Sequence, residues 1–178
     1  GVGASYTWVV QSNTGGVTGA SSGSGATIAQ TLTNPGNTVE TVTYRITPQS
    51  GAGCVGSTVD VDVTVNPTPN VLATPSAETL CSAASTDIVS LSPHAAGATS
   101  YTWTVSQSGV SGATAQAVGV AGPIAQTLTT TGAVQGTVTY TITPSDGTCT
   151  GSSIDVVVTV DPLPDAAATP ETICSGET

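Results

Sequence analysis

Residues 137–144 read Thr-Val-Thr-Tyr-Thr-Ile-Thr-Pro, and residues 154–160 read Ile-Asp-Val-Val-Val-Thr-Val. In both stretches an apolar side chain occupies every second position. A period of two places those side chains on one face of a β-strand. The branched side chains of valine, isoleucine and threonine also favour a pleated backbone. The two stretches therefore predict neighbouring half-buried strands, and the Gly-rich segments around them predict turns.

The same pattern occurs earlier in the chain. Tyr-Thr-Trp at 6–8 returns at 101–103, and residues 41–48 match residues 137–144 with one change, arginine for threonine. The 178-residue chain therefore contains an internal repeat of about 95 residues. We expect three parts. They are a partial repeat at 1–70 without its first strands, a complete repeat at 71–165, and the first strand of a following repeat at 166–178.

Each repeat is predicted to be a small all-β sandwich. Further strands are expected at 87–91, 101–105 and 124–129, and no amphipathic helical stretch exceeds two turns. Six or seven short strands around a tryptophan are typical of an immunoglobulin-like sandwich. The predicted core residues are Trp8 and Tyr44 in the first repeat and Trp103 and Tyr140 in the second. This core is thin for a small domain, so disulfides and contacts between repeats should contribute to stability.

Composition excludes several classes of function. The chain has 11 acidic residues against one basic residue, Arg45, and a net charge of −10. Binding to nucleic acid or to an anionic membrane surface needs Lys and Arg side chains. No apolar run approaches the roughly 20 residues of a membrane span. The single histidine, His94, follows Pro93 without a Ser–His–Asp arrangement. We therefore predict no enzyme, no cofactor and no membrane insertion.

The four cysteines predict an oxidising, extracellular setting, and their spacing lacks the Cys-x-x-Cys pairs of zinc sites. Cys54 is equivalent to Cys149, and Cys81 is equivalent to Cys174. The simplest bond joins Cys81 to Cys149 within one repeat. In immunoglobulin-like wiring, however, these two turns lie at opposite ends of the sandwich. Cys81 could then reach the cysteine of the next repeat that is equivalent to Cys149 and link the junction covalently, and free thiols are a third alternative.

Two proline-rich segments follow the last strand of each repeat. They read Asn-Pro-Thr-Pro at 66–69 and Asp-Pro-Leu-Pro at 161–164. Alternating prolines favour an extended, stiff backbone, so we expect junctions that transmit orientation between repeats. Asp161 and Asp165 could bind Ca²⁺ at such a junction. Because the equivalent Asn66 and Asn70 are uncharged, we interpret these acids as solvated and predict no metal site.

For several other side chains the sequence allows both a structural and a functional interpretation. Asp60 and Asp62 are expected on the outer face of their strand, where charge discourages edge pairing. Arg45 is expected to be solvated, with an ion pair to Glu40 or to a neighbouring subunit as the alternative. An exposed platform that stacks on sugars could be formed by four aromatic residues: Tyr6, Trp8, Tyr101 and Trp103. Because these residues alternate in step with the inward-facing positions of their strands, we expect them in the core instead.

The whole chain resembles the PKD-like repeats of Bacteroidota. The resemblance rests on Thr-Ile-Cys-Ser-Gly-Glu-Thr at 172–178, Tyr-Thr-Trp-Thr-Val at 101–105, Gly-Thr-Cys-Thr-Gly-Ser at 147–152 and Val-Thr-Val-Asp-Pro-Leu-Pro at 158–164. Residues 82–85, Ser-Ala-Ala-Ser, depart from the Ser-Gly-Glu-Thr of the last copy. The resemblance implies very long surface or secreted proteins, often exported by type IX secretion, with no shared catalytic residue.

The predicted function is a non-enzymatic structural repeat of an extracellular filament, adhesin stalk or surface fibre. The alternative is a carbohydrate- or protein-binding accessory module of a secreted protein. The expected partners are neighbouring copies of the same repeat, as a homopolymer or as one continuous array. Separate chains could join if residues 166–178 add a strand to the incomplete first repeat of the next chain. One continuous polypeptide is the preferred expectation.

Overall fold

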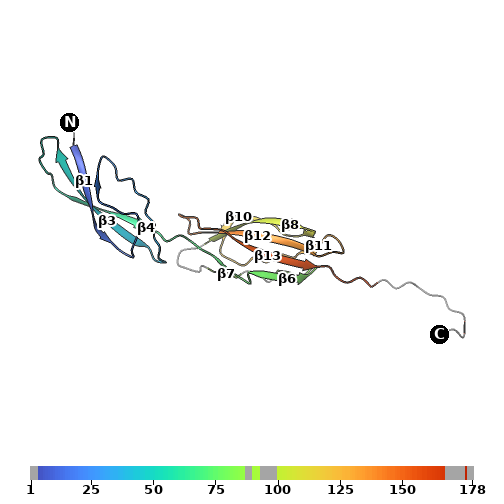
Figure 1. Cartoon of the computed structure of the whole chain (residues 1–178). Coiled ribbons are helices and arrows are strands. Elements are labelled where there is room, and N and C mark those ends of the chain that lie inside the picture. The colour runs from blue at the N-terminus through green and yellow to red at the C-terminus, as the bar shows by residue number, and fades with distance from the viewer. Residues whose placement is uncertain (1–3, 87–89, 93–99, 167–174, 176–178) are drawn as a thin grey trace.

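The computed structural model describes residues 4–86, 90–92, 100–166 and 175, and this part of the chain contains only strands and loops. The fold is all-β and of the immunoglobulin-like sandwich type. Figure 1 shows two elongated bodies that follow one another along the chain. We call residues 4–65 the first repeat and residues 71–161 the second repeat.

The first repeat is a single antiparallel sheet in the order β2-β1-β3-β4. Its strands are β1 (Ala4–Asn13), β2 (Gly23–Ser24), β3 (Glu40–Ser50) and β4 (Val59–Val65). Trp8 on β1 lies opposite Ile46 on β3, and Tyr44 on β3 lies opposite Val61 on β4. These pairs place the apolar residues of three strands on one face, as the period of two predicts.

The second repeat has a larger sheet in the order β10-β8-β12-β13-β6, and two short ladders, β5–β7 and β9–β11. Only β6 runs parallel to its neighbour, β13. The strands are β5 (Leu72–Thr74), β6 (Ala77–Cys81), β7 (Ser90–Ser92), β8 (Ser100–Ser108), β9 (Val110–Ser111), β10 (Gln116–Val120), β11 (Thr129–Thr130), β12 (Gly136–Ser145) and β13 (Ile154–Asp161).

Three of the predicted strands are confirmed, since β8, β12 and β13 cover residues 101–105, 137–144 and 154–160. The expected strand at 87–91 lies partly outside the described residues. The expected strand at 124–129 is wrong in extent, because only β11 forms a ladder there. Residues 124–128 instead bond to a turn at 82–86, in which Ala83 has a positive φ and Ser85 forms an isolated bridge with Thr127.

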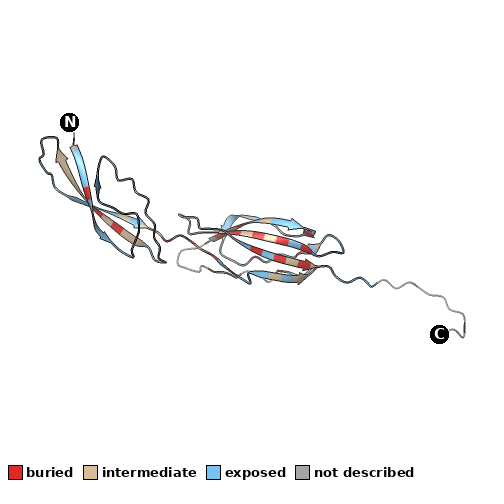
Figure 2. Ribbon diagram, in the orientation of Figure 1, coloured by how far each residue is buried: buried red, intermediate tan, exposed pale blue. Residues whose placement is uncertain are grey.

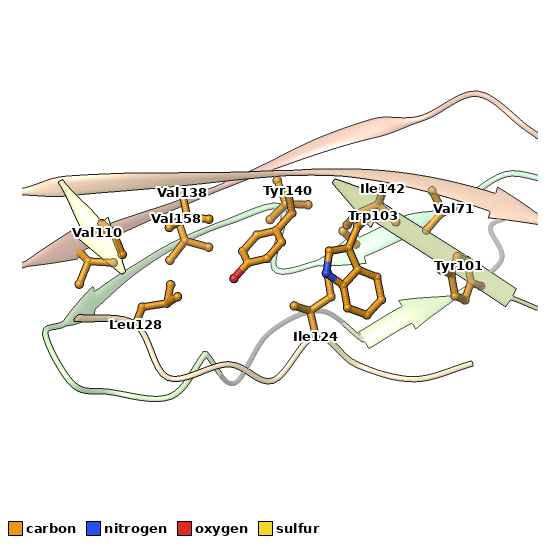
Figure 3. Packing of buried hydrophobic residues seen from close by; sticks show 13 residues of the cluster. Val71, Tyr101, Trp103, Val110, Ile124, Leu128, Val138, Tyr140, Ile142 and Val158 are labelled. Carbon is orange, nitrogen blue, oxygen red and sulfur yellow. The ribbon is translucent and has the colours of Figure 1, made fainter. Parts of the chain in front are cut away.

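The core of the second repeat lies on the inner face of β8, β12 and β13. Figure 3 shows Tyr140 and Trp103 in its middle, with Ile124 and Leu128 packed against them from the facing segment. Six alternating side chains of β12 and β13 are fully buried: Val138, Tyr140, Ile142, Val156, Val158 and Val160. This is the alternation by which the sequence predicted these strands.

The same network of side-chain hydrogen bonds recurs in both cores. In the second repeat the Tyr140 hydroxyl donates to Gln126 Oε1 at 2.9 Å. Gln126 Nε2 and Trp103 Nε1 both donate to the carbonyl oxygen of Thr114, at 2.8 and 3.0 Å. The first repeat has the same network. The Tyr44 hydroxyl donates to Gln30 Oε1, and Gln30 Nε2 and Trp8 Nε1 both donate to the carbonyl oxygen of Ser21, at 2.7 and 3.1 Å. The polar ends of the large aromatic residues are therefore satisfied within each core.

The turn after β6 contains a strained alanine. Ala83 has φ +67°, in the left-handed region that disfavours a Cβ atom. The equivalent residue of the last copy is Gly176. We expect Ala83→Gly to stabilise the second repeat by about 1 kcal/mol, which raises its melting temperature by about 4 °C in scanning calorimetry. Ala84→Gly is the control. Its φ is not positive, so that variant should melt at a lower temperature than the parent chain.

Candidate functional site

The segment between the two repeats is packed rather than free. β4 ends at Val65 and β5 begins at Leu72. Between them Pro67, Pro69 and Val71 are buried. The backbone of Pro69 lies so close to Gly151, in the turn between β12 and β13, that a Cβ atom at Gly151 would overlap the Pro69 carbonyl oxygen. The linker therefore contacts the second repeat at Pro69, beside the turn between β12 and β13.

Both repeats contribute to a hollow at this junction. It has a volume of about 410 Å³ and is lined by Leu32, Thr33, Asn34, Thr64, Val65, Asn66, Thr68, Thr148 and Cys149. Asn34 is buried and donates through Nδ2 to Val65 O at 2.9 Å and to Thr38 O at 2.7 Å. These bonds tie the loop before β3 to the last residue of β4. The end of the first repeat is thereby fixed where the linker begins.

The first repeat has an uncovered apolar face. Val61 is 41% exposed, whereas its equivalent in the second repeat, Val156, is 0% exposed. Tyr6 is 39% exposed, whereas its equivalent Tyr101 is 3% exposed. Figure 2 shows the same contrast, with buried residues dense on the strands of the second repeat and sparse on the first. The two repeats share a sequence pattern but differ in what covers the sheet.

Two hollows occupy this face of the first repeat. One of about 280 Å³ is lined by Tyr6, Trp8, Gly25, Ala26, Thr27, Ile28 and Ile46. Another of about 210 Å³ is lined by Ile28, Gln30, Leu32, Tyr44, Val61 and Val63. Ile28 and Leu32 are only partly buried, whereas their equivalents Ile124 and Leu128 are fully buried. The hollows lie where the core of the second repeat is filled.

In the second repeat this face is covered by residues 71–86. Val71 and Ala73 join the buried core beside Tyr101, as Figure 3 shows for Val71. β6 pairs with β13, and the turn after it bonds to residues 124–128 through Thr86 N to Gln126 O at 2.8 Å and Ala83 N to Leu128 O at 2.8 Å. The described part of the first repeat has no segment equivalent to these. Among the described residues, this face of the first repeat is therefore left uncovered.

The pairing of Cys81 with Cys149 is wrong. Cys81 lies beside Asp161 at the end of β13, while Cys149 precedes Ile154 at the start of β13. The length of β13 separates them by roughly 23 Å at 3.3 Å per residue, far beyond the 7 Å or so that a disulfide allows. Among the described residues Cys54, Cys81 and Cys149 are free thiols. Cys174 lies outside the described residues.

The fold and the repeated motifs agree with a family comparison. A family model described as a PKD-like domain matches residues 1–69 and 78–164. The chain belongs to the PKD-like domain family. A sequence comparison with curated proteins found no match. PKD-like domains are usually extracellular, structural and non-catalytic modules. The two matched ranges overlap the two sequence repeats.

The aromatic residues of the PKD-like repeats lie mainly in the core. Trp8, Tyr44, Trp103 and Tyr140 are buried, and of the aromatics the structure describes, Tyr6 alone is substantially exposed. Tyr6 is thus not a core residue here, contrary to expectation, because no described residue of the first repeat takes the position that Val71 takes beside Tyr101. A platform of several exposed rings is not formed.

The charged residues of the PKD-like repeats form one ion pair in the part described. Arg45 on β3 donates through Nε and Nη2 to both carboxylate oxygens of Asp60 on β4, each at 2.8 Å. Arg45 therefore pairs with its cross-strand neighbour Asp60 and not with Glu40, while its side chain remains 40% exposed to solvent. The guanidinium lowers the pKa of Asp60, and Asp60 raises that of Arg45. In the second repeat Thr141 donates to Asp155 at the equivalent place, at 2.7 Å.

Other candidate sites are weak or not described. No group of three His, Cys, Asp or Glu side chains in the described ranges is arranged to hold a metal ion. Nor do these ranges contain a helix long and apolar enough to cross a membrane. Asp161 accepts from Gln135 Nε2 at 2.6 Å, and Asp165 is exposed. His94 lies outside the described residues.

Two kinds of residue were missed in the sequence. Gln30 and Gln126 stand at one position of the repeated Ile-Ala-Gln-Thr-Leu-Thr motif, and each bonds to the core tyrosine of its repeat. That shared position, together with the shared tyrosine, was an available signal. Gly151 also recurs, as Gly56, but only the structure shows the linker against it.

The core tyrosines predict a loss of stability in alkali. Burial raises the pKa of Tyr140 to about 12 and raises that of Tyr44 as well. The fold favours the neutral phenol, so this contribution is complete below pH 10, the pKa of an unfolded tyrosine, and is lost as pH rises from about 10 to 12. Urea unfolding at several pH values, followed by circular dichroism, should show the decline. Tyr140→Phe should be flatter over this range, and an equal decline in that variant would contradict the assignment.

Proposed function

We propose that the chain is a section of a stiff extracellular rod built from tandem PKD-like repeats, as in an adhesin stalk, a filament or a surface fibre. Its work is mechanical: each repeat holds the next one at a fixed orientation and distance. The observation that carries this proposal is the buried linker, in which Pro67, Pro69 and Val71 leave little freedom between β4 and β5. Proline and burial both remove backbone conformations that a flexible tether would need.

The contacts at the junction support the same reading. On the side of the second repeat, the turn that contains Gly151 packs against the linker at Pro69. On the side of the first repeat, the hydrogen bonds of Asn34 fix the end of β4. The sequence pattern is similar to that of repeats in large surface proteins of Bacteroidota, which are often exported by type IX secretion. We therefore infer that this chain is exported by the same route. Catalytic chemistry has no support in the described side chains, whose only ion pair is Arg45–Asp60.

Small-angle X-ray scattering of the reduced, dilute chain tests the rod. A stiff junction gives one extended distance distribution that fits a single arrangement of the two repeats. Pro67→Gly combined with Pro69→Gly should broaden that distribution while circular dichroism stays unchanged. A parent chain that already requires many arrangements, equal to the double-glycine variant, would overturn the proposal and favour a tethered binding module.

A further inference from the structure

We propose that β6 and β13 form a clamp through which the second repeat bears tension along the chain. This function goes beyond the stiffness of the rod, and it rests on the proposed structural role only for the origin of the force. Tension reaches the second repeat at two places, the linker that ends at Val71 and the segment that follows Asp161. Figure 1 shows that these two segments leave the second repeat at opposite ends.

The direction of the two strands decides how this tension acts on them. β6 runs parallel to β13, with Ala77 beside Val157 and Cys81 beside Asp161. Tension draws β6 back by its first residue, toward the first repeat, and draws β13 forward by its last residue. The two strands are therefore pulled in opposite directions along their common axis. The hydrogen bonds between them are loaded together, whereas a hairpin pulled at its two open ends loses its bonds one at a time.

A shorter ladder precedes this pair along the chain. β5 pairs with β7 over the three residues Leu72–Thr74, whereas β6 pairs with β13 over the five residues Ala77–Cys81. Because the ladder of β5 is shorter and Leu72 is 47% exposed, we expect β5 to detach first under tension. β6 and β13 then hold the load. The main barrier to forced unfolding of the second repeat therefore lies in their ladder.

The turn that follows β6 fastens its end to two other segments. Ser82 N donates to Asp161 O at 2.7 Å, and the Ser82 hydroxyl accepts from Thr130 N at 3.0 Å. The buried Thr86 accepts through its hydroxyl from Gln126 N at 2.7 Å, and its own N–H donates to Gln126 O at 2.8 Å. This turn cannot slide along the sheet without breaking these bonds. β6 is therefore held in register with β13 while it is pulled.

Alternate residues of β6 direct their N–H groups to β13. The N–H of Ser82 points to β13, and successive N–H groups of a strand point in opposite directions. Those of Leu80 and Glu78 therefore point to β13 as well. The N–H of Thr79 points to the open edge of the sheet, because β6 is the last strand in the order. Since proline has no N–H, it removes a bond of the clamp at Glu78 but none at Thr79.

Pulling single molecules of the full chain in two directions with optical tweezers tests the clamp. Both directions share an attachment point at the exposed Leu163→Cys. The second point is either Thr68→Cys, with Cys81→Ser, for tension along the chain, or the native Cys81, for tension at one end of the ladder. Serine replaces the unused cysteines: Cys54, Cys149 and Cys174. Unfolding along the chain should need about twofold more force or greater, because the ladder shares the load. The released length, about 300 Å in both directions, identifies the second repeat.

Proline variants then locate the barrier within the second repeat. Under tension along the chain, Glu78→Pro should unfold at a lower force than Glu78→Ala, which keeps the N–H, and Thr79→Pro should unfold near the force of the parent. Equal forces in the two pulling directions would overturn the proposal, as would equal forces for Glu78→Pro and Thr79→Pro. If Glu78→Pro does not fold, as circular dichroism would show, the two pulling directions still decide, since they leave the ladder backbone unchanged. Scattering measures the stiffness of the junction separately, so the rod proposal can stand if the clamp fails.

Discussion

Replacing Gly151 by alanine should open the junction between the two repeats. A Cβ atom there would overlap the Pro69 carbonyl oxygen and press on the Pro144 ring. Neither backbone nor proline ring can swing aside as the end of a flexible side chain does, so the linker must move away. We expect a loss of about 1–3 kcal/mol in the unfolding free energy of the second repeat, typical of overpacking. The scattering profile should broaden toward that of a flexible two-body chain.

Gly56→Ala provides a matched control for this prediction. Gly56 occupies the same turn of the first repeat, but no described linker lies against it, and its nearest neighbour is Pro48 Cγ at 3.0 Å from an added Cβ. Neither glycine has a positive φ, so the substitutions differ in their surroundings and not in backbone strain. The control should change stability by less than about 1 kcal/mol and leave the scattering profile unchanged. Equal effects of the two variants would show that the Pro69 contact does not hold the junction.

The strands were the part of this fold most open to prediction, for a local reason. The alternation at 137–144 and 154–160 depends only on which face of one strand is buried. A sheet with one solvent-exposed face therefore shows a clear alternation of apolar and polar residues in its sequence. β12 and β13 begin and end within about one residue of the predicted stretches. The segment at 124–129 looked similar, but its partner is a turn with Ala83 in the left-handed region. A sequence pattern does not reveal what kind of backbone lies opposite.

Burial that depends on distant segments was beyond the same reasoning. Tyr6 and Tyr101 stand in identical Tyr-Thr-Trp motifs, yet one is exposed and the other buried. The difference arises from Val71 and Ala73, which lie about 30 residues before Tyr101 and have no described counterpart before Tyr6. The same applies to Cys81, whose motif fixes its strand but not the parallel pairing that carries it away from Cys149. Long-range pairing decides these outcomes, and one sequence gives no direct signal of it.

Truncating Leu128 should therefore cost far more than truncating Leu32, its equivalent. Leu128 is fully buried beneath the turn at 82–86, and Leu128→Ala removes apolar contacts on every side. We expect a loss of about 2–5 kcal/mol in the unfolding free energy of the second repeat. Leu32 borders the hollow of the uncovered face and is only partly buried. Leu32→Ala should cost about 1 kcal/mol or less in the isolated chain, because water already reaches one side of it.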